Sequence, residues 1–139
     1  MFLSKFKHKI MTQLTTYTGG CHCGAVRYQV QVEKLIATEC NCSICCKKGF
    51  IHVIVPESRF TLLQGKDSLS TYTFNTGTAK HHFCRHCGIH SFYRPRSHPT
   101  GYDVNLRCLD GDQIDRFEIR SFDGANWEDR IAQIQDRYS

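Results

Sequence analysis

The chain has 139 residues, of which 40% are hydrophobic and 22% are charged, and its formal net charge is +5. These values are ordinary for one soluble globular domain. No apolar run approaches the roughly 18 residues that a membrane-spanning helix needs, so we expect no membrane segment.

The N-terminal segment, residues 1–12, is predicted to be a flexible extension. Its apolar residues are interspersed with three lysines, so it lacks the uninterrupted apolar core of a secretory signal. We therefore expect the protein to stay in a reducing compartment, the cytoplasm, where disulfides are rare. Residues 13–139 are predicted to form a single domain.

A half-buried strand is predicted over residues 25–33. Apolar and polar side chains alternate there, with Tyr28 and Val30 on one face and Gln29 and Gln31 on the other. Shorter runs of β-forming residues, separated by Gly, Pro, Asn and Asp, predict a strand ending near Glu39 and others at 50–55, 59–63, 68–74, 80–83, 89–93, 102–106 and 116–121.

One helix of length is predicted, over residues 126–138. Trp127, Ile131 and Ile134 recur at helical spacing, and Asn126 can cap the N-terminus. We expect the apolar face of this helix to pack on a sheet. With one helical turn at 43–48, the pattern predicts a mostly-β fold: a single domain of small stacked antiparallel sheets with a C-terminal helix.

Seven of the nine cysteines are grouped in three clusters. In a reducing compartment an odd number of cysteines favours metal over disulfides, and CxC pairs are too close to be attractive disulfide partners. Such grouping is typical of zinc sites, and the number of thiols predicts two zinc ions. The clusters are Cys21-x-Cys23, Cys40-x-Cys42-x-x-Cys45 and Cys84-x-x-Cys87.

The first and third clusters together offer four thiolates, the number that a closed tetrahedral zinc site requires. Gly20 precedes the first cluster and Gly88 follows the third, and glycine lets the backbone turn so that amides face the sulfurs. Buried thiols without a metal are the alternative. We expect a structural zinc on Cys21, Cys23, Cys84 and Cys87.

The middle cluster offers only three thiolates, so one zinc position would stay open to water or substrate. A three-thiolate site favours a soft fourth ligand, and an exogenous thiol is the obvious candidate. Alternatively, Cys46 or a histidine closes the site as a second structural zinc, although the side chain of Cys46 should point elsewhere. The candidate catalytic residues are Cys40, Cys42 and Cys45.

Other polar residues carry weaker signals. Arg94 and Arg96 could bind a carboxylate as a fork, although loop arginines are often simply exposed. His81 and His82 precede the third cluster, where a histidine is more often structural, so neither receives a role. We expect Cys108 to pack as a small apolar residue rather than act as a nucleophile.

Four segments carry a family resemblance: 19–27 (GGCHCGAVR), 40–45 (CNCSIC), 71–76 (TYTFNT) and 83–88 (FCRHCG). Together they resemble the glutathione-dependent formaldehyde-activating enzyme family, which also includes centromere protein V. The resemblance runs from about residue 17 to residue 127, and three ordered cysteine motifs make it far more specific than a lone CxxC.

The resemblance implies a zinc β-fold with a structural zinc on the first and third clusters and a catalytic zinc on the middle one. It also implies the reaction that joins glutathione, as co-substrate, to formaldehyde and gives S-hydroxymethylglutathione, formally a carbon–sulfur lyase running in reverse. The partners would then be a small-molecule thiol and aldehyde. No firm motif identifies the residues that contact glutathione or act as general acid or base.

Two other functions remain open at this point. One is a lyase of the same mechanism with another thiol or aldehyde. The other is a non-catalytic zinc-stapled module that binds protein or chromatin through Lys47, Lys48 and residues 94–96. Two zinc ions add four positive charges and seven thiolates add seven negative ones, so the net charge falls to about +2, which makes nucleic acid an improbable partner.

Overall fold

A computed structural model describes residues 13–138, and the predicted extension over residues 1–12 lies outside the described residues. The predicted mostly-β fold with a C-terminal helix is confirmed. The strands are β1 (Thr15–Gly20), β2 (Arg27–Val32), β3 (Ile36–Cys40), β4 (Ile51–Pro56), β5 (Phe60–Gln64), β6 (Leu69–Tyr72), β7 (His81–Cys84), β8 (Phe92–Tyr93), β9 (Gly101–Asn105) and β10 (Glu118–Phe122). The helices are α2 (Ser43–Lys48) and α3 (Trp127–Arg137), with 3-10 turns at Glu57–Arg59, Lys66–Ser68, Leu106–Cys108, Ile114–Arg116 and Gly124–Asn126.

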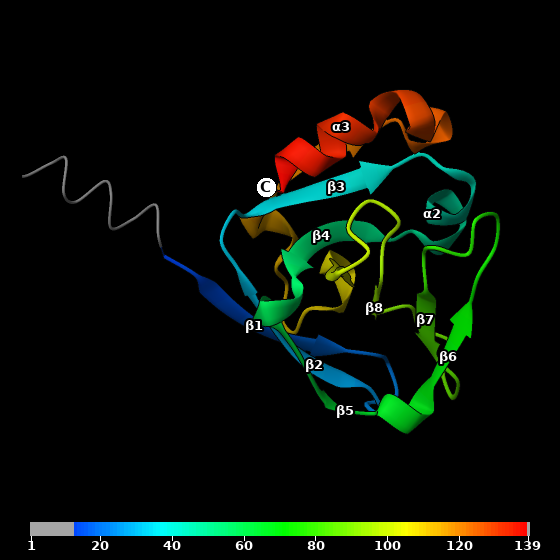
Figure 1. Ribbon diagram of the computed structural model, residues 1–139. Coiled ribbons are helices and arrows are strands. Elements are labelled where there is room, and N and C mark those ends of the chain that lie inside the picture. The colour runs from blue at the N-terminus through cyan, green and yellow to red at the C-terminus, as the bar shows by residue number, and fades with distance from the viewer. Residues whose placement is uncertain (1–12, 139) are drawn as a thin grey trace, which may run out of the picture.

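The strands form three sheets, ordered β1-β2-β5, β10-β3-β4-β9-β8 and β6-β7. The two larger sheets face each other across the main core, and the β6-β7 hairpin stands beside them (Figure 1). Tyr28 and Val30 of β2 are fully buried there with Val53 of β4 and Val104 of β9. Each such side chain stabilises the fold by about 1.5–3 kcal/mol, so this core fixes the sheets that carry the cysteine clusters.

Helix α3 covers the opposite face of the five-stranded sheet (Figure 1). Ile134 is buried against Ile54 of β4 and Phe122 of β10, with Trp127 and Ile131 packed beside them. The predicted packing of this helix on a sheet is confirmed. Consequently β4 is buried on both faces, with alternate residues in the two cores.

The structure corrects the sequence prediction at several points. Strand β1 is not among the predicted strands, and the strand predicted over residues 89–93 is only Phe92–Tyr93. The predicted antiparallel sheets include one parallel pair, β3 with β10, because the chain returns to the sheet edge running in the same direction as β3. Asn126 makes no side-chain cap on α3, because its amide donates instead to the Asp123 carboxylate at 2.8 Å.

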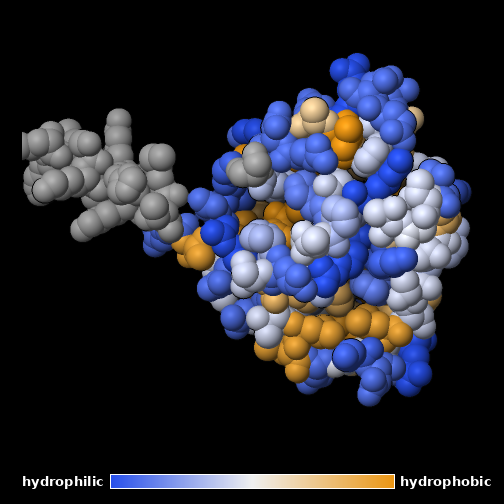
Figure 2. Space-filling view, in the orientation of Figure 1, coloured by the Kyte–Doolittle hydropathy of each residue, from blue (hydrophilic) through white to orange (hydrophobic). Residues whose placement is uncertain are grey.

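Among the described residues, no helix is long and apolar enough to cross a membrane. Figure 2 shows a polar surface over α3, while apolar surface gathers at the opposite edge, beside the three-stranded sheet. Leu63 of β5 is the most exposed large apolar side chain described, at 54%.

Candidate metal centres and active-site cleft

The first and third clusters meet in one group of four sulfurs, although 61 residues separate Cys23 from Cys84. All four Sγ atoms lie within 4.8 Å of one another. The Sγ atoms of Cys21 and Cys23 are 3.7 Å apart, and those of Cys23 and Cys84 are 3.6 Å apart. Zinc–sulfur bonds of about 2.3 Å in a tetrahedron place sulfurs roughly 3.8 Å apart, so this group could hold a zinc ion.

Backbone hydrogen bonds and a glycine turn position the cysteines of this group. The amide of Val26 donates to the Sγ of Cys21 at 3.3 Å. The turn after Cys84 closes through its carbonyl, which accepts from the Gly88 amide at 2.7 Å. Gly88 has φ of 75°, a left-handed conformation that favours glycine, so the predicted backbone turn after Cys87 is present.

The middle cluster forms where β3 passes into α2. Cys40 ends the strand, Cys42 is the N-cap residue of the helix, and Cys45 lies in its first turn. Their sulfurs lie within 4.8 Å of one another, as ligands of one metal ion would. Hence the predicted helical turn at 43–48 brings the three thiols together.

The three thiols cannot all ionise together without a cation. Hydrogen bonds from Cys40 and Cys45 hold the pKa of Cys42 well below that of a free thiol. Hydrogen bonding to Cys42 raises the pKa of Cys40 to about 11, and hydrogen bonding to Cys40 and Cys42 raises the pKa of Cys45 strongly. One thiolate shared by two thiols is a ready receptor for a divalent metal, which would displace the two remaining protons.

No fourth protein ligand completes this group among residues 13–138. Cys46 is exposed and lies outside the group of mutually close sulfurs. Nε2 of His52 lies 3.2 Å from the Sγ of Cys45, but this histidine does not come within 4.8 Å of all three sulfurs. The donor set is therefore three thiols, which suits a zinc ion with one position left for another ligand.

His52 and Asp103 are site residues that the sequence interpretation missed. Nδ1 of His52 lies 2.6 Å from Oδ2 of Asp103, and both side chains are buried. Asp103 is paired with Ile54 across β4 and β9, which makes His52 its diagonal neighbour on the same face. The available signal was a titratable residue inside each of two largely apolar strands, His52 in β4 and Asp103 in β9.

A loop closes over the middle cluster from the far end of the chain. The side chain of Asn41 donates to Asp123 at 3.0 Å and accepts from the Ala125 amide at 2.9 Å. Gly124 lies so close to Cys40 that an added Cβ would overlap the Sγ of Cys40. Asn41, between two of the cysteines, therefore fastens this loop onto the three-thiol cluster.

The three thiols open onto a cleft of about 530 Å³, within the roughly 300–1,000 Å³ of typical small-molecule sites. One wall comes from α3 and its preceding loop, including Trp127, and the other from the loop after β6, including Phe74 and Asn75. Two buried polar atoms lining this cleft have no hydrogen-bond partner among the described residues: Nε2 of His81 and Oδ1 of Asp103. The cleft thus offers a polar ligand both nitrogen and oxygen.

Arg94 and Arg96, the two arginines that could bind a carboxylate, differ in their position relative to the cleft. Arg94 already has partners within the fold: it donates to the Tyr102 hydroxyl at 2.7 Å and pairs with Glu57 at 3.1 Å. Arg96 does line the cleft, where its guanidinium stacks on Trp127 at 3.7 Å and pairs with Glu128 at 2.7 Å. Of the two, only Arg96 borders the candidate site.

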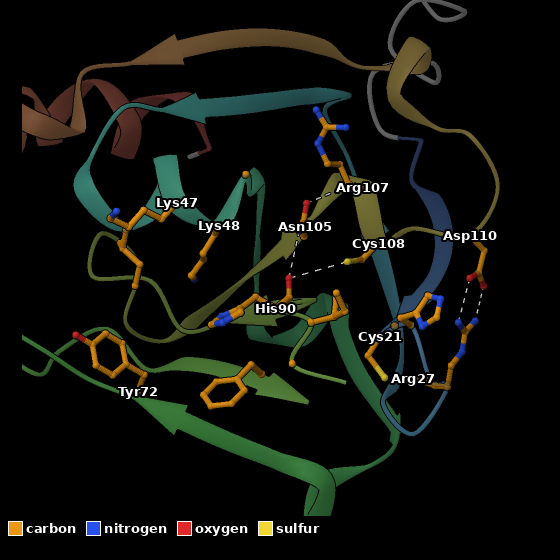
Figure 3. A pocket seen from close by; sticks show the side chains of 17 residues that line it. Cys21, Arg27, Lys47, Lys48, Tyr72, His90, Asn105, Arg107, Cys108 and Asp110 are labelled. Atoms are coloured by element: carbon orange, nitrogen blue, oxygen red, sulfur yellow. Dashed lines mark hydrogen bonds and ion pairs between the residues drawn. The ribbon is translucent and has the colours of Figure 1, made fainter. Parts of the chain in front are cut away.

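A larger cleft, of about 930 Å³, lies on the other side of α2 (Figure 3). It is lined by Cys21 and Cys108, but Cys21 belongs to the four-sulfur group, and burial raises the pKa of Cys108 to about 11. Arg27 is neutralised there by Asp110, as the dashed lines show. The smaller cleft is the candidate active site because an incomplete set of thiols lies there, and a packing role for Cys108 agrees with its burial.

The comparisons with known proteins agree with the geometry. A family model described as glutathione-dependent formaldehyde-activating enzyme matches residues 16–122, a span that includes all three cysteine clusters. A crystal structure of a Rhodobacter sphaeroides protein is 38% identical to this chain, and the match covers 76% of this chain and 99% of that one, with a TM-score of 0.69.

Proposed function

Since the chain belongs to the glutathione-dependent formaldehyde-activating enzyme family, we propose that it is a zinc-dependent carbon–sulfur lyase. Its substrates are a thiol, glutathione in the first instance, and a small aldehyde such as formaldehyde. In the joining direction the thiol sulfur forms a bond to the carbonyl carbon, and the π electron pair moves to the oxygen. That oxygen takes up the proton that the thiol gives up, so the product is an S-hydroxymethyl adduct.

The observation that carries this proposal is the incomplete set of three thiols lining a ligand-sized cleft. Zinc bound by Cys40, Cys42 and Cys45 would supply a position at which an incoming thiol loses its proton readily. The chain's own part is to hold these ligands still. His52, held by Asp103, orients Cys45, and the Asn41-fastened loop fixes the sulfur of Cys40.

We assign the four-sulfur group a structural zinc. Its donor set is complete, and the side chain of Cys84 is only 1% exposed. The group ties the turn before β2 to the end of β7, which belong to different sheets. All nine cysteines are free, which supports placing the protein in a reducing compartment such as the cytoplasm.

The described basic residues give little support to a non-catalytic binding module. Lys48 is turned toward His81, at 3.1 Å from Nδ1, instead of toward solvent. Arg94 and Arg96 are engaged by Tyr102 and Trp127, as described above. Of the basic residues that would serve such a module, only Lys47 remains exposed and without a described partner.

The test is the rate at which formaldehyde exchanges with its glutathione adduct, measured by exchange NMR with ¹³C-labelled formaldehyde. Thiols react with formaldehyde spontaneously, so the reference is the same mixture with the Cys42→Ser variant. We expect the zinc-loaded protein to accelerate exchange with glutathione more than with cysteine or 2-mercaptoethanol. Equal rates with wild type and Cys42→Ser would refute the proposed function, and equal acceleration of all three thiols would refute only the assignment to glutathione.

A further inference from the structure

His81 is a buried histidine with one ring nitrogen left unsatisfied. It begins β7, its residue is 3% exposed, and it lines the cleft that holds the middle cluster. Its Nε2 has no hydrogen-bond partner among residues 13–138. A buried polar atom without a partner destabilises the fold, so its presence in a ligand-sized cleft indicates a partner that arrives with the ligand.

The other ring nitrogen of His81 fixes where the proton lies. Nζ of Lys48 is 3.1 Å from Nδ1. A lysine ammonium donates and cannot accept, so Nδ1 must accept, and the neutral ring carries its hydrogen on Nε2. The ammonium is itself held over the rings of Phe50 and Tyr93, 5.0 and 4.5 Å from their centroids. Lys48 therefore makes the unsatisfied Nε2 a hydrogen-bond donor.

The ring of His81 is also held in place by its neighbours. It stacks on Tyr93 with centroids 4.9 Å apart and on Phe74 with centroids 5.4 Å apart. Burial and the charge of Lys48 lower the pKa of His81 to about 4, so the ring stays neutral near pH 7. A fixed, neutral N–H donor is well suited to receive negative charge that develops on an oxygen, because it needs no reorganisation during the reaction.

We propose that His81 is a further catalytic residue, whose Nε2–H donates to the aldehyde oxygen as the carbon–sulfur bond forms. In the reverse direction the same donor holds the adduct oxygen as the bond breaks. Lys48 is a positioning residue that keeps the hydrogen on Nε2. This inference rests on the proposed function, and it gives the reaction an oxygen-stabilising group that the cysteines do not provide.

The test is the kinetics of variants on the zinc-loaded protein. Loss of one such donor typically lowers kcat by about 10²–10³-fold, so we expect a fall of this size in His81→Ala, with KM for glutathione within about threefold. His81→Gln should regain part of the rate, because its amide can donate from a similar place. Lys48→Met should lower kcat by less, about tenfold, and should add little to His81→Ala in the double variant.

The matched control is His82→Ala, the next residue of the same strand. His82 faces the other way, and its Nδ1 lies 2.8 Å from the Thr71 hydroxyl. We expect its kcat to stay within twofold of wild type. Wild-type kcat in His81→Ala, or an equal loss in His82→Ala, would overturn the inference.

A readout without turnover tests the position of the proton. In ¹⁵N NMR of the zinc-loaded protein, His81 should show a protonated Nε2 and an unprotonated Nδ1, and Lys48→Met should abolish that preference. The opposite tautomer in wild type would overturn the inference. This spectrum and the wild-type exchange rate distinguish failure of the proposed function from failure of the inference about His81. An inactive wild type refutes the proposed function. An active wild type whose rate does not change in His81→Ala refutes only the role of this residue.

Discussion

Nε2 of His52 lies 3.2 Å from the Sγ of Cys45, and the two residues are seven positions apart across the turn between α2 and β4. On the far side of the ring, Nδ1 is 2.6 Å from Oδ2 of Asp103. A carboxylate that orients a histidine against a metal-ligating sulfur fixes the direction and basicity of that ligand. The strength of metal binding at the middle cluster should therefore depend on a residue that does not touch the metal.

Asp103→Asn tests this dependence. The amide keeps the shape of the carboxylate but can turn a donor toward Nδ1, which disturbs the ring that faces Cys45. We expect zinc at the middle cluster to bind about 10–100-fold more weakly, as measured by competition with a coloured chelator. Asp110→Asn, which alters an exposed ion pair with Arg27, is the control and should retain wild-type affinity. Identical affinities for both variants would contradict the proposed link.

The two cysteine groups should respond differently to loss of one sulfur. Cys84→Ser opens the group that ties two sheets together, so we expect loss of one zinc ion and a Tm lower by roughly 10 °C or more. Cys42→Ser should also lose one zinc ion, but with a Tm change of only a few degrees and no measurable catalysis. Metal analysis and thermal unfolding monitored by circular dichroism give both quantities.

Cys46→Ser is the control for this pair, because Cys46 is exposed and lies outside both groups. It should keep two zinc ions per chain and the wild-type Tm. The division of roles would be wrong if Cys84→Ser and Cys42→Ser lowered the Tm equally, or if Cys46→Ser lost a metal ion.

Gly124→Ala should damage the middle site without touching a ligand. The added Cβ would overlap the Sγ of Cys40, so either the sulfur or the loop held by Asn41 must move. We expect weaker zinc binding at the middle cluster and at least a tenfold loss of activity, while the four-sulfur group keeps its metal. Ala125→Ser adds one atom at the exposed neighbouring position and should leave both unchanged. A fully active Gly124→Ala protein would show that this close contact is not required.

The pH dependence of stability should carry a contribution from His81. The folded-state pKa is about 4 against an ordinary value of 6.5, so the unfolded chain takes up the proton first as the pH falls. The contribution of neutral His81 to the free energy of unfolding is therefore fully present above pH 6.5 and is lost as the pH falls from 6.5 to 4. Between pH 7 and pH 5, the free energy of unfolding of His81→Gln, measured with urea, should fall by about 1–2 kcal/mol less than that of wild type. Parallel losses in both proteins would show that His81 is charged when folded.

Local patterns in the sequence predict much of this molecule. Alternation over β2 and the helical spacing of Trp127, Ile131 and Ile134 are short-range signals, and both elements form as expected. By contrast, β1 has the sequence TTYTGG, which carries one large apolar side chain and shows no alternation. It becomes a strand because it pairs with β2 along its whole length.

In the candidate site, too, some residues can be predicted from local sequence and others cannot. Each cysteine cluster is contiguous in sequence, so its metal-binding character is visible without a structure. The approach of His52 to Asp103 depends on the register between β4 and β9, and that of Lys48 to His81 joins α2 to the hairpin of β7. These are long-range contacts between single polar residues, for which one sequence contains no periodic signal.

The central claim is that the metal of the middle cluster has a position for a substrate thiol. Cobalt(II) in place of zinc reports this directly through its thiolate-to-metal absorption, with the Cys42→Ser protein as the background from the four-sulfur group. Glutathione should intensify and shift that band in a saturable titration, whereas S-methylglutathione, which has no free thiol, should not. An unchanged spectrum at saturating glutathione, in a protein shown to carry two cobalt ions, would contradict the open position.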